Sequence, residues 1–143
     1  MRWLRWRPDR GSAAVEMAVL MPLFVVLFTG AIVIGRTGSA ISAVEMAAYD
    51  GARTASLARD ATSARTSATG AVAESLSRLG LSCRGGPDVV VDTAGFGEPV
   101  GTPASVTVRV TCQVSFSDIG SGLPGRVASA SFVSPLDQYR VRR

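Results

Sequence analysis

The sequence contains no histidine and no lysine, so that all fifteen of its basic residues are arginine. Without histidine the chain cannot form a Ser-His-Asp triad, a Cys-His dyad or a histidine-ligated metal site. Without lysine it lacks the phosphate-binding P-loop motif, and no Gly-x-Ser-x-Gly nucleophile motif occurs either. We therefore expect no enzyme activity, no small-molecule substrate, no cofactor and no metal.

The arginines are scattered along the chain, except in the first ten residues and at the tail, Arg140, Arg142 and Arg143. The formal net charge of +4 is modest. Binding of nucleic acid generally requires a concentrated basic patch, so this distribution does not favour a nucleic-acid partner.

One long apolar run stands near the N-terminus. The eighteen residues from Met17 to Ile34 carry no charge, and as a helix they would span about 27 Å, close to the hydrocarbon thickness of a bilayer. The rest of the chain offers no apolar surface large enough to bury such a helix. Four arginines precede the run and only Arg36 and Arg53 follow it closely, so we expect a membrane helix with a cytoplasmic N-terminus and an extracytoplasmic C-terminal region.

Glu16 immediately precedes this run. A carboxylate on the apolar part of a membrane helix costs up to a few kcal/mol and is usually paired with a cation. Glu16 either stays hydrated at the level of the lipid headgroups or finds a cation. If the chain were cut between Gly11 and Ser12, the new α-amino group would lie four residues before Glu16, on the same helical face. That amine could neutralise the carboxylate within one subunit or between neighbours.

A short basic leader, a glycine before a small residue, a glutamate five residues after that glycine and an apolar helix resemble the processing site of type IV prepilins and pseudopilins. The segments that carry a closer resemblance, to the TadE-like (TadE/TadF-type) family, are Arg10-Gly11-Ser12-Ala13-Ala14-Val15-Glu16, Leu20-Met21-Pro22-Leu23 and Gly35-Arg36. Members of that family are pseudopilins or minor pilins of the tight-adherence (Flp) pilus. The resemblance implies cleavage after Gly11 by a prepilin peptidase, and as partners the membrane, other pilin subunits and the pilus assembly platform.

The segment Ala47-Ala48-Tyr49-Asp50-Gly51-Ala52-Arg53 extends this resemblance. Proteins of the family carry an Ala-Ala-Arg-Glu-Gly-Ala-Arg-like sequence here, from which Tyr49 and Asp50 depart. The small residues either let this helix pack closely against the predicted strands or contact a partner, and the sequence leaves both open.

Two other interpretations of the N-terminal region remain. An ordinary secretory signal could be cleaved near Gly38-Ser39-Ala40, although Glu16 and the length of the apolar run argue against it. Alternatively, the chain is a single-pass, membrane-anchored binding domain that is neither processed nor polymerised.

Residues 37–81 are rich in alanine and contain no proline, which favours helix. Apolar residues at spacings of three and four predict one narrow buried stripe: Ile41, Val44, Ala48, Ala52 and Ala55. Gly51, Gly70 and Gly80 are candidate points for a break or a cap, so one helix or two can form.

From residue 83 onward the pattern is typical of strands. Residues 88–93 form a short β-branched run, whereas 94–103 are typical of a loop and 117–125 of a connection. Between them, apolar and polar residues alternate over 104–116, as in a half-buried strand. The apolar residues on one face are Val106, Val108, Val110, Cys112, Val114 and Phe116. A third strand over 126–133 is expected to use Val127, Ala128, Ala130 and Phe132.

Cys83 and Cys112 are the two cysteines, and both fall in the region expected outside the membrane. An even pair in an oxidising compartment predicts a disulfide, which would close a loop of about thirty residues and stabilise the domain by about 3 to 4 kcal/mol. The alternative is a pair of free buried thiols.

Together these patterns predict a pilin-like α+β chain: a transmembrane helix continues into an alanine-rich extracytoplasmic helix, and a small antiparallel sheet of about three strands packs on it. We expect a basic leader (1–11), a transmembrane helix (12–35), a helical segment (36–82) and a β-sheet region (83–143).

Overall fold

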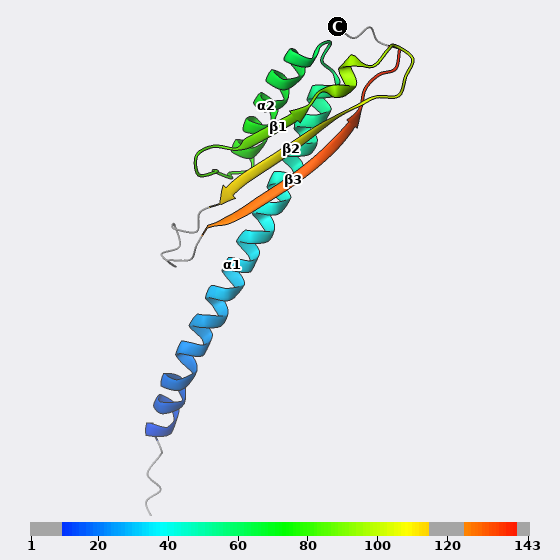
Figure 1. Ribbon diagram of the computed structural model, residues 1–143. Helices are drawn as coiled ribbons and strands as arrows, with labels where there is room; N and C mark the ends of the chain where they lie inside the picture. Colours follow the sequence, from blue (N-terminus) through cyan, green and yellow to red (C-terminus); the bar gives the residue numbers. More distant parts are fainter. Residues whose placement is uncertain (1–9, 115–124, 140–143) are drawn as a thin grey trace, which may run out of the picture. The chain divides into compact units, whose positions relative to one another are not determined.

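The computed structural model describes residues 10–114 and 125–139 and divides into two units, Met1–Arg36 and Thr37–Arg143. Its elements are α1 (Arg10–Ser56), α2 (Ala61–Arg78), β1 (Asp88–Asp92), the 3-10 helix η1 (Ala94–Gly97), β2 (Ser105–Val114) and β3 (Arg126–Pro135) (Figure 1). A long apolar helix, a second helix and a small antiparallel sheet confirm the predicted α+β fold. Most of the predicted leader, residues 1–9, lies outside the described residues, as does the tail from residue 140.

The first unit contributes the N-terminal half of α1. Its large apolar side chains are exposed; Phe24, for example, is 54% exposed and Phe28 67%. Within the described residues, α1 is the helix long and apolar enough to cross a membrane, and its apolar window is not buried. The helix continues through Pro22. These properties fit a single-pass membrane anchor.

Two helices, rather than one, cover residues 37–81. The break falls at 57–60, where Asp60 caps α2: its carboxylate accepts hydrogen bonds of 2.8 Å from the amide and from the hydroxyl of Ser63. The candidate breaks at Gly51 and Gly70 were wrong, because both glycines lie inside helices. Gly80, with φ of 68°, does mark the end of α2. Here the capping carboxylate, not a glycine, sets where the first helix gives way to the second.

The cap at Asp60 predicts a specific pH dependence. The hydrogen bonds from the amide and then from the hydroxyl of Ser63 lower the pKa of Asp60 below its ordinary value of 3.8. Its contribution to stability is therefore fully present above that value and is lost as the pH falls through the lower, folded-state pKa. We expect thermal unfolding of the full chain in detergent, compared with Asp60→Asn, to show a gap in midpoint that closes on acidification. A gap that stays constant from neutral to acidic pH would contradict this account, because Asn retains the capping acceptor but does not titrate.

The sheet has the order β1-β2-β3, with both pairings antiparallel and β2 in the centre. The alternation predicted for the central strand is confirmed by four fully buried side chains, those of Val106, Val108, Val110 and Cys112. Val114 is half-buried, and Phe116 falls in residues 115–124, outside the described part of the chain. The prediction of loop throughout 94–103 was wrong, because η1 forms there and buries Phe96.

Strand β3 extends two residues beyond its predicted end, to Pro135. Ala128 is buried, whereas Val127 is 64% exposed. The register explains the difference: Val127 lies opposite Gln113, on the face of the sheet away from the helices, whereas Ala128 lies opposite Cys112. In an antiparallel sheet, neighbouring residues of a strand point to opposite faces, so only one of this pair could join the core.

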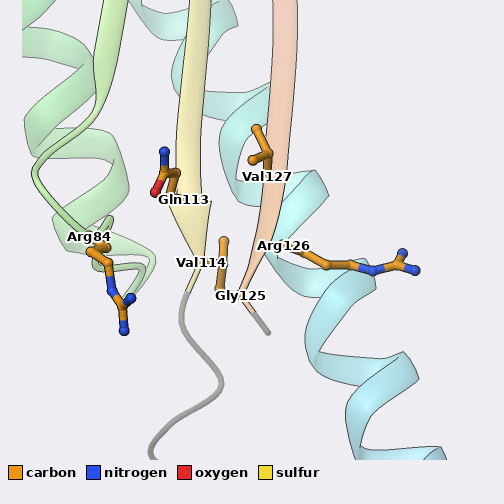
Figure 2. Close-up of a pocket in the computed structure, with 6 residues that line it drawn as sticks. All are labelled: Arg84, Gln113, Val114, Gly125, Arg126 and Val127. Atoms are coloured by element: carbon orange, nitrogen blue, oxygen red, sulfur yellow. The ribbon is translucent and has the colours of Figure 1, made fainter. Parts of the chain in front are cut away.

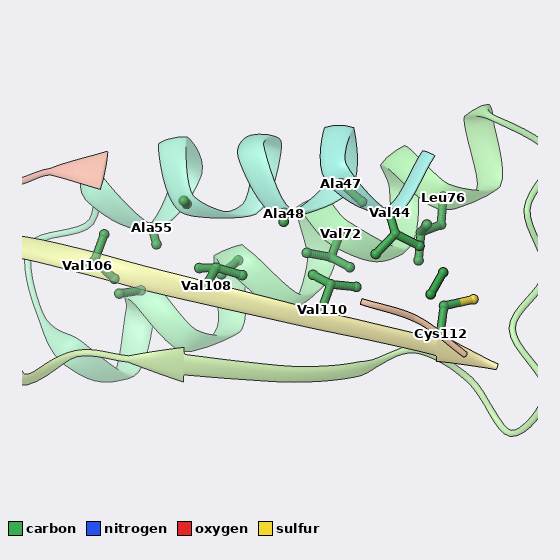
Figure 3. Close-up of a cluster of buried hydrophobic side chains, with 14 of the residues drawn as sticks. Val44, Ala47, Ala48, Ala55, Val72, Leu76, Val106, Val108, Val110 and Cys112 are labelled. Atoms are coloured by element: carbon green, nitrogen blue, oxygen red, sulfur yellow. The ribbon is translucent and has the colours of Figure 1, made fainter. Parts of the chain in front are cut away.

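The core lies between one face of the sheet and the two helices, α2 and the second-unit part of α1 (Figure 3). Four members of the predicted stripe are buried: Val44, Ala48, Ala52 and Ala55. Ile41 was predicted wrongly, since it is 43% exposed while Ala40 and Ala43 are buried in its place. The contact face of α1 is therefore built mainly from alanine, and α2 supplies the larger Val72 and Leu76.

Gly51 lies where α1 closely approaches α2 and β2. A Cβ atom at this position would stand 2.7 Å from Cγ2 of Val72 and 3.3 Å from Cγ1 of Val108, two stiff and fully buried side chains. Overpacking of this kind costs about 1 to 3 kcal/mol. We expect Gly51→Ala to lower the free energy of unfolding, measured by denaturant titration of the full chain in detergent.

The matched control is Gly70→Ala. Gly70 lies inside α2, and a Cβ atom there would meet nothing within 4 Å. Alanine in a helix is more stable than glycine by about 0.5 to 1 kcal/mol. The two substitutions should therefore move the unfolding midpoint in opposite directions, and a shift in the same direction would disprove the close approach at Gly51.

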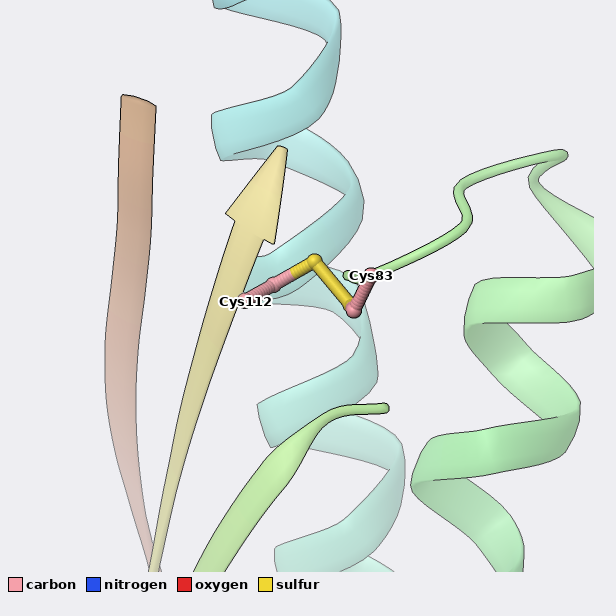
Figure 4. The surroundings of a disulfide bond; sticks show 2 residues. All are labelled: Cys83 and Cys112. Atoms are coloured by element: carbon pink, nitrogen blue, oxygen red, sulfur yellow. A yellow bond between two sulfur atoms is a disulfide. The ribbon is translucent and has the colours of Figure 1, made fainter. Parts of the chain in front are cut away.

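The disulfide is formed as predicted between Cys83 and Cys112, whose Cα atoms are 5.1 Å apart (Figure 4). It joins the segment after α2 to the central strand. Next to it, the amide of Arg84 donates a 2.8 Å hydrogen bond to the carbonyl oxygen of Gln113. The chain leaving the helices is thus fixed to β2 before it turns into β1.

Candidate functional site

The predicted processing site lies at the start of α1. The helix begins at Arg10, so the backbone of Gly11 and Ser12 is helical and Ser12 precedes Glu16 by four residues. Four residues of α-helix rise about 6 Å and complete about one turn, which puts positions 12 and 16 on one face. This helical conformation is the one that the proposed pairing of an amine at position 12 with Glu16 requires.

The carboxylate of Glu16 is exposed and is surrounded along the helix by exposed apolar side chains, such as those of Val15 and Val19. Among the residues that the structure describes, no ion pair to Glu16 is formed. A carboxylate in this setting can accept hydrogen bonds from an ammonium group, and an ammonium group would also neutralise its charge. Hydration at the headgroup level and pairing with a cation both remain compatible with this exposure.

The second candidate segment, residues 47–53, divides its side chains between the core and the surface. Its small residues are buried against the sheet and α2: Ala47, Ala48, Gly51 and Ala52. Tyr49 makes an edge-to-face contact with Phe132 of β3, with ring centroids 4.8 Å apart. These contacts give most of the segment a packing role, one of the two interpretations that the sequence left open.

The polar residues of this segment also point to structure. The carboxylate of Asp50 accepts a 2.8 Å hydrogen bond from the hydroxyl of Ser75 and lies 3.5 Å from the guanidinium of Arg78. Arg53 donates a 3.4 Å hydrogen bond to the hydroxyl of Tyr49. Asp50 thus links α1 to α2, and the side chains of Tyr49 and Arg53 are the exposed ones of this segment.

A small pocket that the sequence analysis missed lies at the paired ends of β2 and β3, where Val114 lies opposite Arg126. Its described lining is Arg84, Gln113, Val114, Gly125, Arg126 and Val127 (Figure 2). Its volume of about 120 Å³ is below the range of roughly 300 to 1,000 Å³ that is usual for pockets of small organic ligands. The pairing of Val114 with Arg126 and the hydrogen bond from the amide of Arg84 to Gln113 bring these residues together, and no spacing in the sequence indicates either contact.

Within residues 10–114 and 125–139, no cluster of histidine, cysteine, aspartate or glutamate could hold a metal ion. The described residues include an exposed apolar helix with the carboxylate of Glu16 near its start, and a disulfide-linked α/β unit.

Comparison with known proteins found no match among curated proteins or solved structures. A family model described as "TadE-like protein" matches residues 11–53. The match begins at Gly11, the residue after which cleavage is predicted, and ends at Arg53, the last residue of the second candidate segment. Over residues 11–53 the chain is similar to this family, and the family resemblance predicted from its sequence is confirmed there.

Proposed function

We propose that this chain is a minor pilin or pseudopilin that contributes to the assembly of a tight-adherence (Flp-type) pilus at the cell envelope. The TadE-like match indicates a minor pilin associated with such a pilus. The observation that carries the proposal is the composition of the matched segment: it starts at Gly11, contains Glu16, and continues through an exposed apolar helix. That segment combines a leader-cleavage site, a membrane anchor and an acidic residue at the anchor's start.

In this proposal the chain first inserts as a single-pass membrane protein, with its N-terminus in the cytoplasm and its second unit outside. A prepilin peptidase then hydrolyses the Gly11–Ser12 bond, which releases the leader and leaves an α-amino group on Ser12. This group is positively charged near neutral pH when its pKa is close to 8. Its position one helical turn before Glu16 lets the two charges neutralise each other in an apolar environment.

Such pairing also explains how a subunit could leave the lipid for a pilus. The exposed apolar side chains of α1 are covered by lipid before assembly and by helices of neighbouring pilin subunits afterwards. If Glu16 of one subunit pairs with the α-amino group of a neighbouring subunit, the pair favours one register between the two adjacent helices. Buried polar groups fix the register of packed helices in the same way. The assembly platform and other pilin subunits are the partners that this scheme requires, and it assigns no catalytic role to the chain.

The alternative is a membrane-anchored binding domain that is neither cleaved nor polymerised. Its support is the second unit itself, which forms a disulfide-linked core apart from the anchor. The two proposals differ in what happens to residues 1–11: the pilin proposal requires their removal, and the alternative retains them as a topology signal.

Gly11→Ala separates the two proposals. We expect this substitution to block removal of the leader, so that the chain made in its own host keeps the mass of the full-length protein, whereas the wild type loses residues 1–11. Gly30→Ala is the matched control, because a Cβ atom at Gly30 of the same helix meets nothing within 4 Å. A wild type that also keeps the full-length mass, so that Gly11→Ala differs from it only by the added methylene group in intact mass spectrometry, would favour the unprocessed anchor.

A further inference from the structure

The outer edge of β3 carries main-chain groups that point away from β2. The amide of Leu136 donates a 2.8 Å hydrogen bond to the carbonyl oxygen of Ala104, just beyond the paired strands, and this bond fixes the alternation of the ladder. Every second residue of an antiparallel strand bonds to its neighbour, so the residues of β3 that bond to β2 are the even-numbered ones. The amide and carbonyl groups at the outer edge therefore belong to the odd-numbered residues Val127, Ser129, Ser131 and Val133.

The two edges of the sheet differ in how they are protected. β1 has five residues, begins and ends with aspartate, and is contacted by α2. β3 has ten residues, and between Arg126 and Pro135 it contains no charge and no proline. Its four odd-numbered residues from 127 to 133 are exposed, and no other described part of the chain forms a hydrogen bond with their main-chain groups. Natural sheets usually block such an edge with charge, proline or a covering element, so the open edge of β3 is suited to pairing with another strand.

Exposed apolar side chains flank this edge on both faces of the sheet. On the face toward the helices, Phe132 contacts Tyr49 with ring centroids 4.8 Å apart, and each side chain is 39% exposed. Met46 precedes Tyr49 by three residues, on the same side of α1, and is 52% exposed. On the other face, Val127 and Val133 are 64% and 55% exposed. The side chains of an added strand would cover apolar surface on both faces.

We propose that the outer edge of β3 binds an extended, uncharged segment of another protein chain, which joins the three-stranded sheet as a fourth strand. Main-chain donors and acceptors that recur every second residue, about 7 Å apart, match an extended backbone. The absence of charge along this edge favours an uncharged segment. The flanking apolar residues favour a segment with apolar side chains at alternate positions.

A second copy of this chain is a less suitable occupant of the edge. Val106 lies beside Ala55 and Cys112 lies near Val44 (Figure 3). Because β3 is antiparallel to β2, it runs in the same direction as the second-unit part of α1. Two β3 strands paired antiparallel would thus place Thr37 of the two copies at opposite ends of the joined sheet, although each copy continues from Thr37 to an anchor in the same membrane. The choice of a different chain rests on the membrane-anchored topology proposed above, whereas the open edge does not depend on it.

The test is residue-resolved hydrogen exchange of the full chain in detergent. The probe strand is a synthetic peptide with the uncharged sequence of residues 127–135 and blocked ends. At a peptide concentration about ten times its dissociation constant, about a tenth of the chains keep an open edge. We therefore expect exchange about tenfold slower at the odd-numbered amides from Val127 to Val133. The even-numbered amides already bond to β2 and should not change.

Ser131→Pro removes one amide from the outer edge without removing a bond to β2, and it should abolish the slowing. Ser131→Thr is the matched control, because it keeps the amide and should retain the effect. Unchanged exchange of the even-numbered amides in Ser131→Pro shows that β2 and β3 are still paired. A probe peptide that carries Ser129→Pro and Ser131→Pro tests the same requirement on the wild-type chain and should give no slowing.

Three results would overturn the inference. They are no slowing by the probe peptide, equal slowing of odd-numbered and even-numbered amides, and slowing that rises with the concentration of the chain when no peptide is present. The last result would assign the edge to a second copy. The mass of the chain made in its own host reports the proposed processing separately, so failure of strand addition and failure of the proposed function are distinguishable.

Discussion

Glu16→Ala is expected to leave the chain in the membrane and to abolish its incorporation into pili. The apolar run from Met17 to Ile34 is untouched by the substitution, and removal of a carboxylate makes insertion more favourable. What is lost is the carboxylate one helical turn after the α-amine of a processed subunit, which is placed to neutralise that amine. The measurement is the amount of the chain in sheared pili relative to the membrane fraction, in the host with its other pilus genes intact.

Two controls make this result specific. Glu16→Gln keeps the size and hydrogen-bonding capacity of the side chain but not its charge, and should fail like Glu16→Ala if charge pairing is the cause. Glu74→Ala removes an exposed carboxylate from α2 and should assemble normally. Normal incorporation of Glu16→Ala into pili would contradict the pairing mechanism. Glu16 would then be a carboxylate that stays hydrated at the level of the lipid headgroups.

Loss of the disulfide is expected to give the largest loss of stability in the second unit. The bond closes a loop with a sequence separation of 29 residues, which corresponds to about 3 to 4 kcal/mol on the chain-entropy model. Cys83→Ala is the variant of choice, because Cys83 is only half-buried and its replacement leaves the fully buried Cys112 in place. We expect denaturant titration of this variant in detergent to show a decrease of that size.

Reduction of the wild type provides the control for the cross-link itself. If closure of the loop is what stabilises the unit, the reduced wild type should unfold at nearly the same denaturant concentration as Cys83→Ala, and reductant should leave the variant unchanged. A loss below about 1 kcal/mol, within the range that a single surface change produces, would show that packing around Cys112 is sufficient without the bond.

Much of this fold could be predicted because its main signals are periodic. The alternation from Val106 to Cys112 and the spacing of Val44, Ala48, Ala52 and Ala55 both reflect a buried face, which recurs every second residue in a strand and every third or fourth in a helix. The errors arose where tertiary contacts, and not periodicity, determine which side chains are buried. Ile41 is apolar but is 43% exposed, because the buried face of α1 runs through Ala40 and Ala43 instead.

Glycine was the least reliable signal of helix ends. Gly51 is needed for the close approach to Val72, and Gly70 is simply tolerated on an exposed face of α2. The break between the helices depends instead on Asp60, whose capping role comes from hydrogen bonds to Ser63 that the sequence permits but does not require.

In the candidate site, too, local spacing could be predicted from the sequence, whereas contacts between elements could not. The relation between Ser12 and Glu16 could be predicted because it depends only on helical spacing, and the described helix contains both positions. The packing of residues 47–53 and the proximity of Arg84 to Arg126 could not, because they depend on how α1, α2 and the strands meet. Local periodicity therefore predicted the membrane-facing part of the chain better than the surface of the α/β unit.

The mature N-terminus is the most direct test of the central claim. Intact mass or Edman sequencing of protein made in its own host, with the pilus genes present, should find a chain that begins at Ser12. A chain that begins at Met1 would contradict processing and favour a retained anchor, and one that begins near Ile41 would indicate a secreted domain that has lost Glu16 altogether.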